Sequence, residues 1–445
     1  MNQIDRSGGS ALIPFLIFVL TFLGAGILLN DFYSFPSPVA VGVGIVSAFF
    51  ILKGTTQAKV EALIRGCGDS KIITMCVIYL LAGAFAAVSK AVGGVDATVN
   101  LGLSLVPVQY LALGVFLLAV FLSTATGTSV GCIVALGPIV VGLAEQSGSS
   151  MPLMLGSLLG GAMFGDNLSF ISDTTIAATQ SQECSMKDKF RVNLLIAGPA
   201  ALITILLLLV AGHEPVAGAS VAALPDSFSF WQLVPYLLVL VLAVVGVDVF
   251  VVLTIGTVAS GVVGLSQGSL ELLGFSQQVY EGFTSMTEIF LLSMLTGGLA
   301  EMVREAGGIQ YLLEKVSGSI SGKRSAQLGI SALVSGTNAA IANNTVSIVV
   351  TGPVARDISR TYGVDKRKSA AVLDIYSCIV QGLLPYGAQM LIMLSYTNGS
   401  VSFVDVWAHA WYLYLLLFFS LLSIFTPFVD KYISRKPQEA VRVAA

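Results

Sequence analysis

The sequence predicts an all-α polytopic membrane protein built from inverted-topology repeats, with two re-entrant helical hairpins and discontinuous helices. Of the 445 residues, 55% are hydrophobic and only 11% are charged, and the mean hydropathy is +0.88. A soluble domain carries about 25% charged residues. Apolar runs such as 11–30 and 193–211 are long enough to cross a bilayer as helices. Composition therefore predicts the membrane class, and the basic residues and an internal repeat predict the topology.

Several other classes of protein are not expected. The first apolar run is too long for a signal-peptide core, and no small-x-small cleavage site follows it, so we expect an uncleaved helix. The five cysteines are scattered without a CxxC pair, which argues against a zinc site or a disulfide framework. No HExxH, Walker A or Rossmann fingerprint occurs, and Met163 stands where a Gly-x-Gly-Asp intramembrane protease needs glycine, so we do not expect an enzyme.

The basic residues predict the orientation in the membrane. All Lys and Arg residues except Lys90 fall into six groups, and the polar loops 212–230, 266–288 and 395–403 contain no Lys or Arg. By the positive-inside rule the basic groups are cytoplasmic and these loops are external. We therefore expect a multi-pass protein of the cytoplasmic membrane with both termini in the cytoplasm. The six groups are Arg6; residues 53–71; residues 187–191; residues 304–324; residues 356–368; and residues 431–442.

Following the chain between these groups predicts ten spans and two hairpins. Segment 107–144 begins and ends outside, so we expect a re-entrant hairpin with its polar tip at 123–129. Segment 326–354 has basic loops at both ends and is expected to enter from the cytoplasm, with its tip at 335–345. The spans are expected at about 11–30, 36–52, 72–90, 151–182, 193–211, 232–246, 248–265, 289–303, 369–394 and 407–428.

The two halves of the chain resemble each other. Residues 12–20 are similar to 233–241 and residues 81–94 to 295–308, and the Gly-Pro pairs at 137–138 and 352–353 keep nearly the same offset. Corresponding loops carry opposite charge patterns, which predicts opposite sides of the membrane. Inverted repeats are typical of secondary transporters, whose sites lie at the repeat interface. We expect a first repeat at 10–182 (hairpin 107–144, broken helix 151–182), a linking span at 193–211, a second repeat at 230–395 (hairpin 326–354, broken helix 369–394) and a final span at 407–428.

The stretch GDNLSFISDTTIAAT, residues 165–179, is unusually polar for this chain. An ionised Asp in the membrane costs on the order of 3 kcal/mol, a cost that is tolerable if the carboxylate binds a cation. We expect the helix to break near Ser172, with Asp173 anchoring the cation and Asp166 exchanging protons. The alternative is that these groups only cap helices or link them. The candidate ion-binding residues in this stretch are Asp166, Asn167, Ser169, Ser172, Asp173, Thr174 and Thr175.

The hairpin tips and a second helix break supply further candidates. Aligning Pro138 with Pro353 places Thr128 and Ser129 opposite Asn343 and Asn344. Small polar groups and free carbonyls at such tips can coordinate Na⁺, although they can also simply join helices. The other candidates are Thr345 beside the second tip and Gln381, Tyr386 and Gln389 around Pro385; the preferred Na⁺ ligands are Asp173, Asp166, Ser129 and Asn344.

Other polar residues and glycines receive structural interpretations. We expect Asp374 either to join the site or to pair with the cytoplasmic basic loop, and we expect no basic residue at mid-membrane. The pairs Gly160-Gly161 and Gly297-Gly298 are expected to permit close helix packing.

Residues 161–179 resemble the signature of NhaC-type sodium/proton antiporters, a family of the ion transporter superfamily. Gly165, Asp166, Ser169, Ser172 and Asp173-Thr174-Thr175 match its Gly-Asp and Ser-Asp-Thr-Thr cores. The hairpin tips only approximate the Ser-Asn-Thr motifs of sodium-coupled carboxylate transporters in that superfamily. The resemblance implies an elevator-type transporter performing Na⁺/H⁺ antiport, or alternatively Na⁺- or H⁺-coupled transport of an amino acid or small organic acid. It implies membrane lipid, Na⁺ and H⁺ as partners, no nucleic acid, no cofactor beyond Na⁺ as coupling ion, and a homodimer.

Overall fold

The computed structural model describes residues 8–29, 35–170, 172–211, 230–245 and 247–435. Arg6, Lys436, Arg442 and residues 212–229 of the expected external loop lie outside these ranges. Within them the regular elements are helices; seven are individually long and apolar enough to cross a membrane, and two bent pairs raise that number to nine. The protein is therefore a multi-span helical membrane protein.

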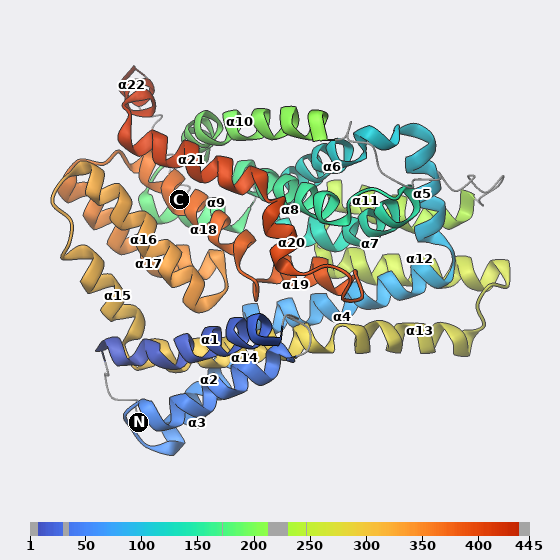
Figure 1. The fold of residues 1–445 in the computed structure, drawn as a ribbon, viewed down its shortest axis with the longest axis horizontal. Coiled ribbons are helices and arrows are strands. Elements are labelled where there is room, and N and C mark those ends of the chain that lie inside the picture. Colours follow the sequence, from blue (N-terminus) through green and yellow to red (C-terminus); the bar gives the residue numbers. More distant parts are fainter. Residues whose placement is uncertain (1–7, 30–34, 171, 212–229, 246, 436–445) are drawn as a thin grey trace, which may run out of the picture.

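The first half of the chain and the second half contain the same succession of helices (Figure 1). The first half has α1 (Ile13–Leu29), α2 (Ser37–Ile51), α3 (Thr56–Cys67), α4 (Ser70–Ala91), α5 (Gly94–Leu105), α6 (Leu111–Thr126), α7 (Ser129–Ser147), α8 (Met151–Leu168) and α9 (Asp173–Gln182). The second has α11 (Phe230–Val244), α12 (Val249–Gln267), α13 (Leu272–Ser285), α14 (Thr287–Glu305), α15 (Gly308–Ser317), α16 (Lys323–Ile341), α17 (Asn344–Tyr362), α18 (Lys366–Leu383) and α19 (Ala388–Ser395).

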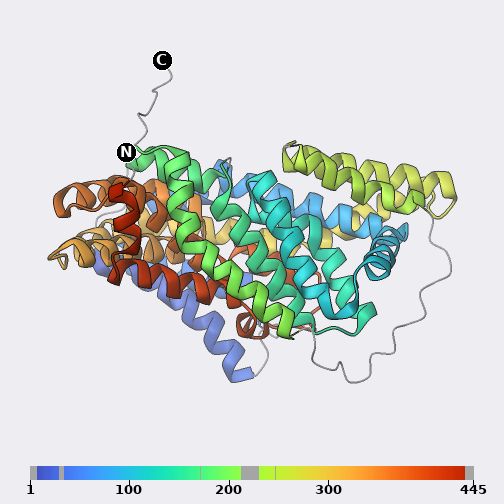
Figure 2. The same ribbon diagram turned by 90° about the horizontal axis from the view of Figure 1, so that it is seen from above.

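Four helices stand outside this correspondence. Helix α10 (Met186–Ala211) links the halves, and Figure 2 shows it in green across α6, α8 and α21, with which it packs. The chain ends with α20 (Phe403–Ala408), α21 (Trp411–Phe425) and α22 (Phe428–Arg435). The expected final span, 407–428, contains α21, and the chain bends by 64° between α21 and α22 at the end of this span.

Both segments expected to form re-entrant hairpins are helix-turn-helix units with matching turns; that they re-enter the membrane rather than cross it remains a prediction. Gly127 ends α6 with φ 70°, and Ala342 ends α16 with φ 54°. The left-handed region costs glycine little but strains alanine, so the second turn is held by its surroundings. Thr128 and Asn343 then cap the next helices, each side chain accepting a hydrogen bond from a backbone N–H of the first turn.

The correspondence continues through the rest of both halves. Helices α7 and α17 have 19 residues each, contain one proline and end at a left-handed glycine. Helices α8 and α18 have 18 residues each and both end at a break. The two members of each equivalent pair are separated by the same number of positions in the sequence. These pairs are Thr128 and Asn343, Gly148 and Gly363, Ser169 and Leu384, and Ser172 and Gly387.

The packing of the helices is also equivalent in the two halves. Helix α2 packs on α14 as α12 packs on α4, and α3 packs on α14 as α13 packs on α4. Helix α7 packs on α19 as α17 packs on α9. Each half thus contributes to the surroundings of the other, as expected for two interlocked inverted repeats. The residue boundaries of the repeats remain a prediction.

Two segments that we predicted as loops contain amphipathic helices. Helix α3 lies in segment 53–71, and α13 lies in segment 266–288, where it meets α14 at an angle of 43°. Their glycines explain how they dock. A Cβ on Gly66 would collide with the Gly297 carbonyl, and a Cβ on Gly83 would collide with the Gly282 carbonyl. The predicted close packing at Gly297 and Gly298 is confirmed by their contacts with α3.

Ion pairs join the basic groups of distant segments at one end of the molecule, which is the left end in Figure 1. These contacts bring the basic groups to the same end of the molecule, which is consistent with the prediction that they lie on one side of the membrane. The pairs are Arg65 with Glu305, Lys323 and Lys368 with Asp430, and Arg356 and Arg360 with Glu183.

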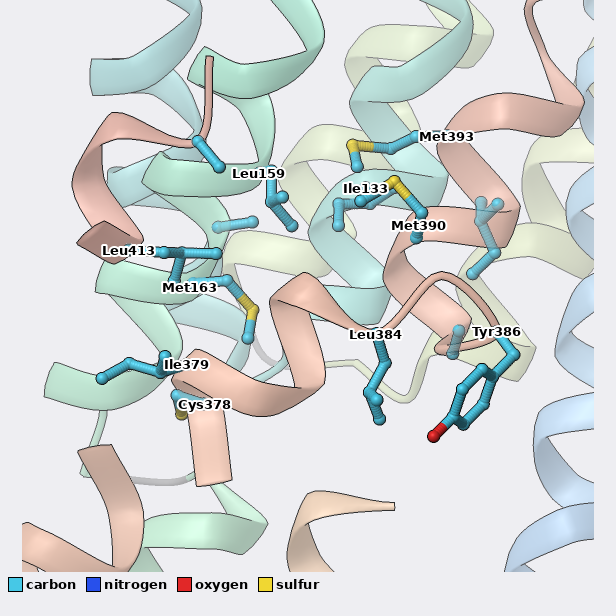
Figure 3. Packing of buried hydrophobic residues seen from close by; sticks show 14 of the residues in the cluster. Ile133, Leu159, Met163, Cys378, Ile379, Leu384, Tyr386, Met390, Met393 and Leu413 are labelled. Carbon is cyan, nitrogen blue, oxygen red and sulfur yellow. The ribbon is translucent and has the colours of Figure 1, made fainter. Parts of the chain in front are cut away.

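The breaks in α8–α9 and α18–α19 lie within a tightly packed core. Figure 3 shows Leu384 and Tyr386 at the second break, with Met390 of α19 beside Ile133 of α7. All four side chains are buried. This packing holds the broken segments in place next to the hairpin tips.

Candidate functional site

The two hairpin tips and the two helix breaks border one cavity of about 290 Å³. Residues 127–131 come from the first tip and residues 342–345 from the second. Asp166, on the last turn of α8, and Gln381, on the last turn of α18, line it from the breaks. The remaining wall comes from Ser70, Thr74, Met75 and Ile78 of α4 and Val249 of α12.

Asp166 is the most firmly held carboxylate in this cavity. Its side chain is 4% exposed. Ser129 donates to Oδ2 through its hydroxyl at 2.7 Å and its backbone N–H at 3.3 Å, and the Ser172 hydroxyl donates to Oδ1. Hydrogen bonds to a charged carboxylate are stronger than neutral ones. Serines of the first hairpin tip and of the helix break thus donate hydrogen bonds to the same carboxylate.

A chain of hydrogen bonds connects Asp166 to the second half of the molecule. Gln381 Nε2 donates to Gln389 Oε1 at 3.0 Å, and Gln389 Nε2 donates to the Ser129 hydroxyl at 3.1 Å. The Ser129 hydroxyl in turn donates to Asp166, which completes the chain of hydrogen bonds. Gln381 Oε1 is fully buried and accepts no hydrogen bond from the described residues.

Asp173 occupies a different environment from Asp166. It is the first residue of α9, it lines the cavity, and it is exposed. The Ser172 hydroxyl, although next to Asp173 in sequence, turns back to Asp166 because the break between α8 and α9 brings that carboxylate within reach. Asp173 therefore lies at the mouth of the cavity and Asp166 lies at its floor.

Most of the candidate residues named from the sequence line this cavity, and four do not. Ser169 donates to the Thr124 carbonyl, and Thr175 accepts a hydrogen bond from Lys189. Asn167 is buried behind the break, against Asn193. Tyr386 does not line the cavity, and its hydroxyl donates to the Ala339 carbonyl. The residues that line it are Thr128, Ser129, Asp166, Ser172, Asp173, Thr174, Asn343, Asn344, Thr345, Gln381 and Gln389.

The sequence did not reveal a buried ion pair behind the break. Lys189 Nζ lies 2.5 Å from Asp374 Oδ2, with side-chain exposures of 1% and 0%. We had assigned Lys189 to a cytoplasmic basic group and expected no basic residue at mid-membrane, and we had expected Asp374 either to join the site or to pair with the cytoplasmic basic loop. The placement of Asn193 on the same face of α10, one turn after Lys189, is the signal that could have suggested an inward-facing polar pair.

Comparisons with known proteins show the family to which the chain is related. A protein-family profile described as the Na⁺/H⁺ antiporter family matches residues 11–213 and 218–429. The chain is 25% identical over 426 residues to the Na⁺/H⁺ antiporter NhaC of Bacillus subtilis, covering 88% of this chain and 92% of that protein.

Other relatives carry organic substrates in their names. The chain is 26% identical over 308 residues to the malate-2H⁺/Na⁺-lactate antiporter of Bacillus subtilis, covering 66% of this chain and 65% of that one. It is 26% identical over 426 residues to the arginine/ornithine antiporter ArcD of Halobacterium salinarum, covering 87% and 86%. Among solved structures it is similar to the YdaH transporter of Alcanivorax borkumensis, with a TM-score of 0.42 and 14% identity over 81% of this chain and 85% of that one.

Proposed function

The chain belongs to the Na⁺/H⁺ antiporter family, and from this membership we propose that it exchanges Na⁺ for H⁺ across the cytoplasmic membrane, with Asp166 binding both ions. It is a secondary transporter rather than an enzyme. The observation that carries the proposal is the single buried carboxylate shared by a hairpin tip and a helix break. Both termini are proposed to face the cytoplasm.

Competition for the oxygens of Asp166 explains exchange. A hard cation such as Na⁺ prefers carboxylate, hydroxyl and carbonyl oxygens as ligands. The hydroxyls of Ser129 and Ser172 donate to the empty carboxylate, but a hydroxyl can rotate and offer lone pairs to a cation instead. Gln381 and Thr174 also line this cavity, and each carries a side-chain oxygen. A proton on Asp166 removes the negative charge that attracts Na⁺, so either ion excludes the other.

Asp173 is proposed to act before Asp166. Its carboxylate lies at the mouth of the cavity and raises the local concentration of cations there. Asn343, Asn344 and Thr345 of the second tip face the same space and are proposed to complete the coordination shell as the ion reaches Asp166. Access would alternate by movement of the hairpins and broken helices past the wall formed by α4 and α12.

Ion flux in proteoliposomes tests this proposal. An inward Na⁺ gradient should drive protons outward, as followed with an internal pH dye, and Asp166→Asn should abolish both fluxes. The matched control is Asp96→Asn, because Asp96 is an exposed carboxylate away from the cavity that accepts a hydrogen bond from Gln146. Sodium flux without counterflow of protons in the wild type would reject the exchange.

The size and lining of the cavity favour one second candidate, Na⁺- or H⁺-coupled transport of an amino acid or small organic acid. One water occupies about 30 Å³, whereas sites for small molecules begin near roughly 300 Å³. The cavity, at about 290 Å³, is therefore larger than a bare ion requires. Its amides at Asn344, Gln381 and Gln389 offer donors for a carboxylate. A thermal-shift screen with Na⁺, amino acids and organic acids, followed by counterflow of any stabilising compound, distinguishes the two candidates.

A further inference from the structure

The buried ion pair of Lys189 and Asp374 lies directly behind the break between α8 and α9. Lys189 Nζ donates to the backbone carbonyl of Asn167 at 2.9 Å and to the Thr175 hydroxyl at 2.7 Å, in addition to its contact with Asp374. These three oxygens come from the end of α8, the start of α9 and the middle of α18. A carbonyl, a hydroxyl and a carboxylate converging at a broken helix are the ligand types that a bound alkali cation would take.

The surrounding residues complete this arrangement. Asn193 Nδ2 lies 2.9 Å from the Asn167 carbonyl, 2.6 Å from Asn167 Oδ1 and 2.9 Å from Asp374 Oδ2. The ammonium group also faces the carbonyl end of α8, where the helix dipole favours positive charge. Since Asn167 directly follows Asp166, the same contacts hold the backbone beside the proposed ion-binding carboxylate.

We propose that Lys189 is a tethered cation, a protein-borne ammonium that permanently occupies a second cation position at the break. It neutralises Asp374 and holds the two half-helices, so that exchangeable ions are confined to the Asp166 side. This inference rests on the proposed function only where it says that ions exchange at Asp166. That Lys189 occupies the second cation position follows from its contacts alone. Lys189 and Asp374 are positioning residues, because neither lines the cavity.

Removing the tether should uncover the second position. Lys189→Ala deletes the atoms of a propylammonium ion and leaves Asp374 unpaired inside the protein, and an unpaired buried charge is strongly destabilising. The melting temperature of the purified variant in detergent and Na⁺-free buffer should fall by roughly 5 °C or more. Addition of n-propylammonium should recover much of this loss, whereas tetramethylammonium, which has no N–H donor, should not.

Sodium should also enter the vacated position. Equilibrium binding of radioactive Na⁺ should show one more bound ion per protein in Lys189→Ala than in the wild type. This difference is informative even if the wild type binds no Na⁺, in which case the proposed function fails while the tethered cation survives. Adding Asp374→Asn to the variant should remove both the extra ion and the response to propylammonium.

The matched control is Lys368→Ala. Lys368 is also fully buried, but it donates to the Ser423 carbonyl and lies 3.3 Å from Asp430, away from the cavity. Equal responses to propylammonium or Na⁺ in the two lysine variants would overturn the proposal, as would a response that persists without Asp374. If Lys189→Ala does not fold, the double variant Lys189→Met/Asp374→Asn must be more stable than either single change; a double variant no more stable than the singles would equally overturn it.

Discussion

Asp166 and Gln381 occupy equivalent positions on the last turns of α8 and α18, facing the same cavity from opposite halves of the chain. A hydrogen-bond chain through Gln389 and Ser129 joins them. One half therefore supplies a carboxylate where the other supplies a neutral amide. This asymmetry limits the pair to one negative charge, which matches a site that holds either one proton or one monovalent cation.

Replacing Gln381 with Asp should change the ion stoichiometry. A second carboxylate at the equivalent position would bind an additional cation or proton, since a buried negative charge needs a partner. The ratio of H⁺ to Na⁺ can be measured from the reversal potential of transport in proteoliposomes. Gln381→Asn keeps the amide and serves as the control. An unchanged ratio in an active Gln381→Asp protein would argue against equivalent roles for the two positions.

Bulky apolar residues at the hairpin tips should abolish transport without preventing membrane insertion. Ser129→Leu removes the hydroxyl that bonds Asp166 and fills the cavity, and Asn344→Leu fills it from the other tip. Ser129→Ala should retain partial activity, because the backbone N–H of residue 129 still reaches Asp166. Transport rate and the amount of folded protein should be measured together.

The control for the tip variants is Ser104→Leu, since Ser104 is exposed on α5 and bonds only the Leu101 carbonyl among the described contacts. Full activity in both tip variants would reduce the tips to helix-packing elements.

Gly83→Ala and Gly42→Ala should change stability in opposite directions. A Cβ on Gly83 meets the Gly282 carbonyl, and overpacking of this kind costs about 1–3 kcal/mol. A Cβ on Gly42 meets nothing within 4 Å, and replacing glycine by alanine inside a helix gains about 0.8–1.0 kcal/mol. Melting temperatures of the two purified variants provide the test. Equal shifts would mean that the close approach of α4 and α13 contributes nothing to stability.

The features that were predicted from sequence depend on local chemistry. Runs of apolar residues reveal spans, the polar run 123–129 indicates a hairpin tip, and Pro385 marks a break. The polar motif around Asp166 stands out because its composition conflicts with its hydrophobic surroundings. Such signals require no knowledge of what packs against them, and they predicted the cavity-lining tips and breaks.

The features that were missed depend on tertiary packing. Lys189 belongs to a basic run that looks cytoplasmic, and only the arrangement of α10 against α8, α9 and α18 turns it inward. The helix break near Ser172 was expected, but the hydrogen bond from its hydroxyl to Asp166 depends on how sharply the chain turns there. Helices α3 and α13 were read as loops because their hydrophobic faces are short and depend on glycine contacts with other helices.

Labelling should find Lys187 and Lys366 on the same side of the membrane. Glu183 pairs with Arg356 and Arg360, so the loops that follow α9 and α17 must lie together. Cysteines at 187 and 366, in a background without reactive native cysteines, should react with an impermeant maleimide only after the cytoplasmic side is exposed. A cysteine at 269, in the turn between α12 and α13, should react from outside. Opposite labelling of 187 and 366 would refute the topology.

Asp166→Asn and Asp173→Asn should have separable effects on Na⁺ affinity. The amide introduced by Asp166→Asn could neither bind the exchanged proton nor offer a charge to Na⁺, so exchange and the pH dependence of Na⁺ affinity should both be lost. Asp173 is exposed, and an attraction across solvent is worth on the order of 1 kcal/mol, so Asp173→Asn should weaken affinity by less than about tenfold and keep its pH dependence. Isothermal titration of Na⁺ at several pH values provides the measurement. Loss of pH dependence only in Asp173→Asn would show that the exchange site is at the mouth of the cavity and not at its floor. The carboxylate that binds the proton must be the one whose removal abolishes the pH dependence of Na⁺ affinity.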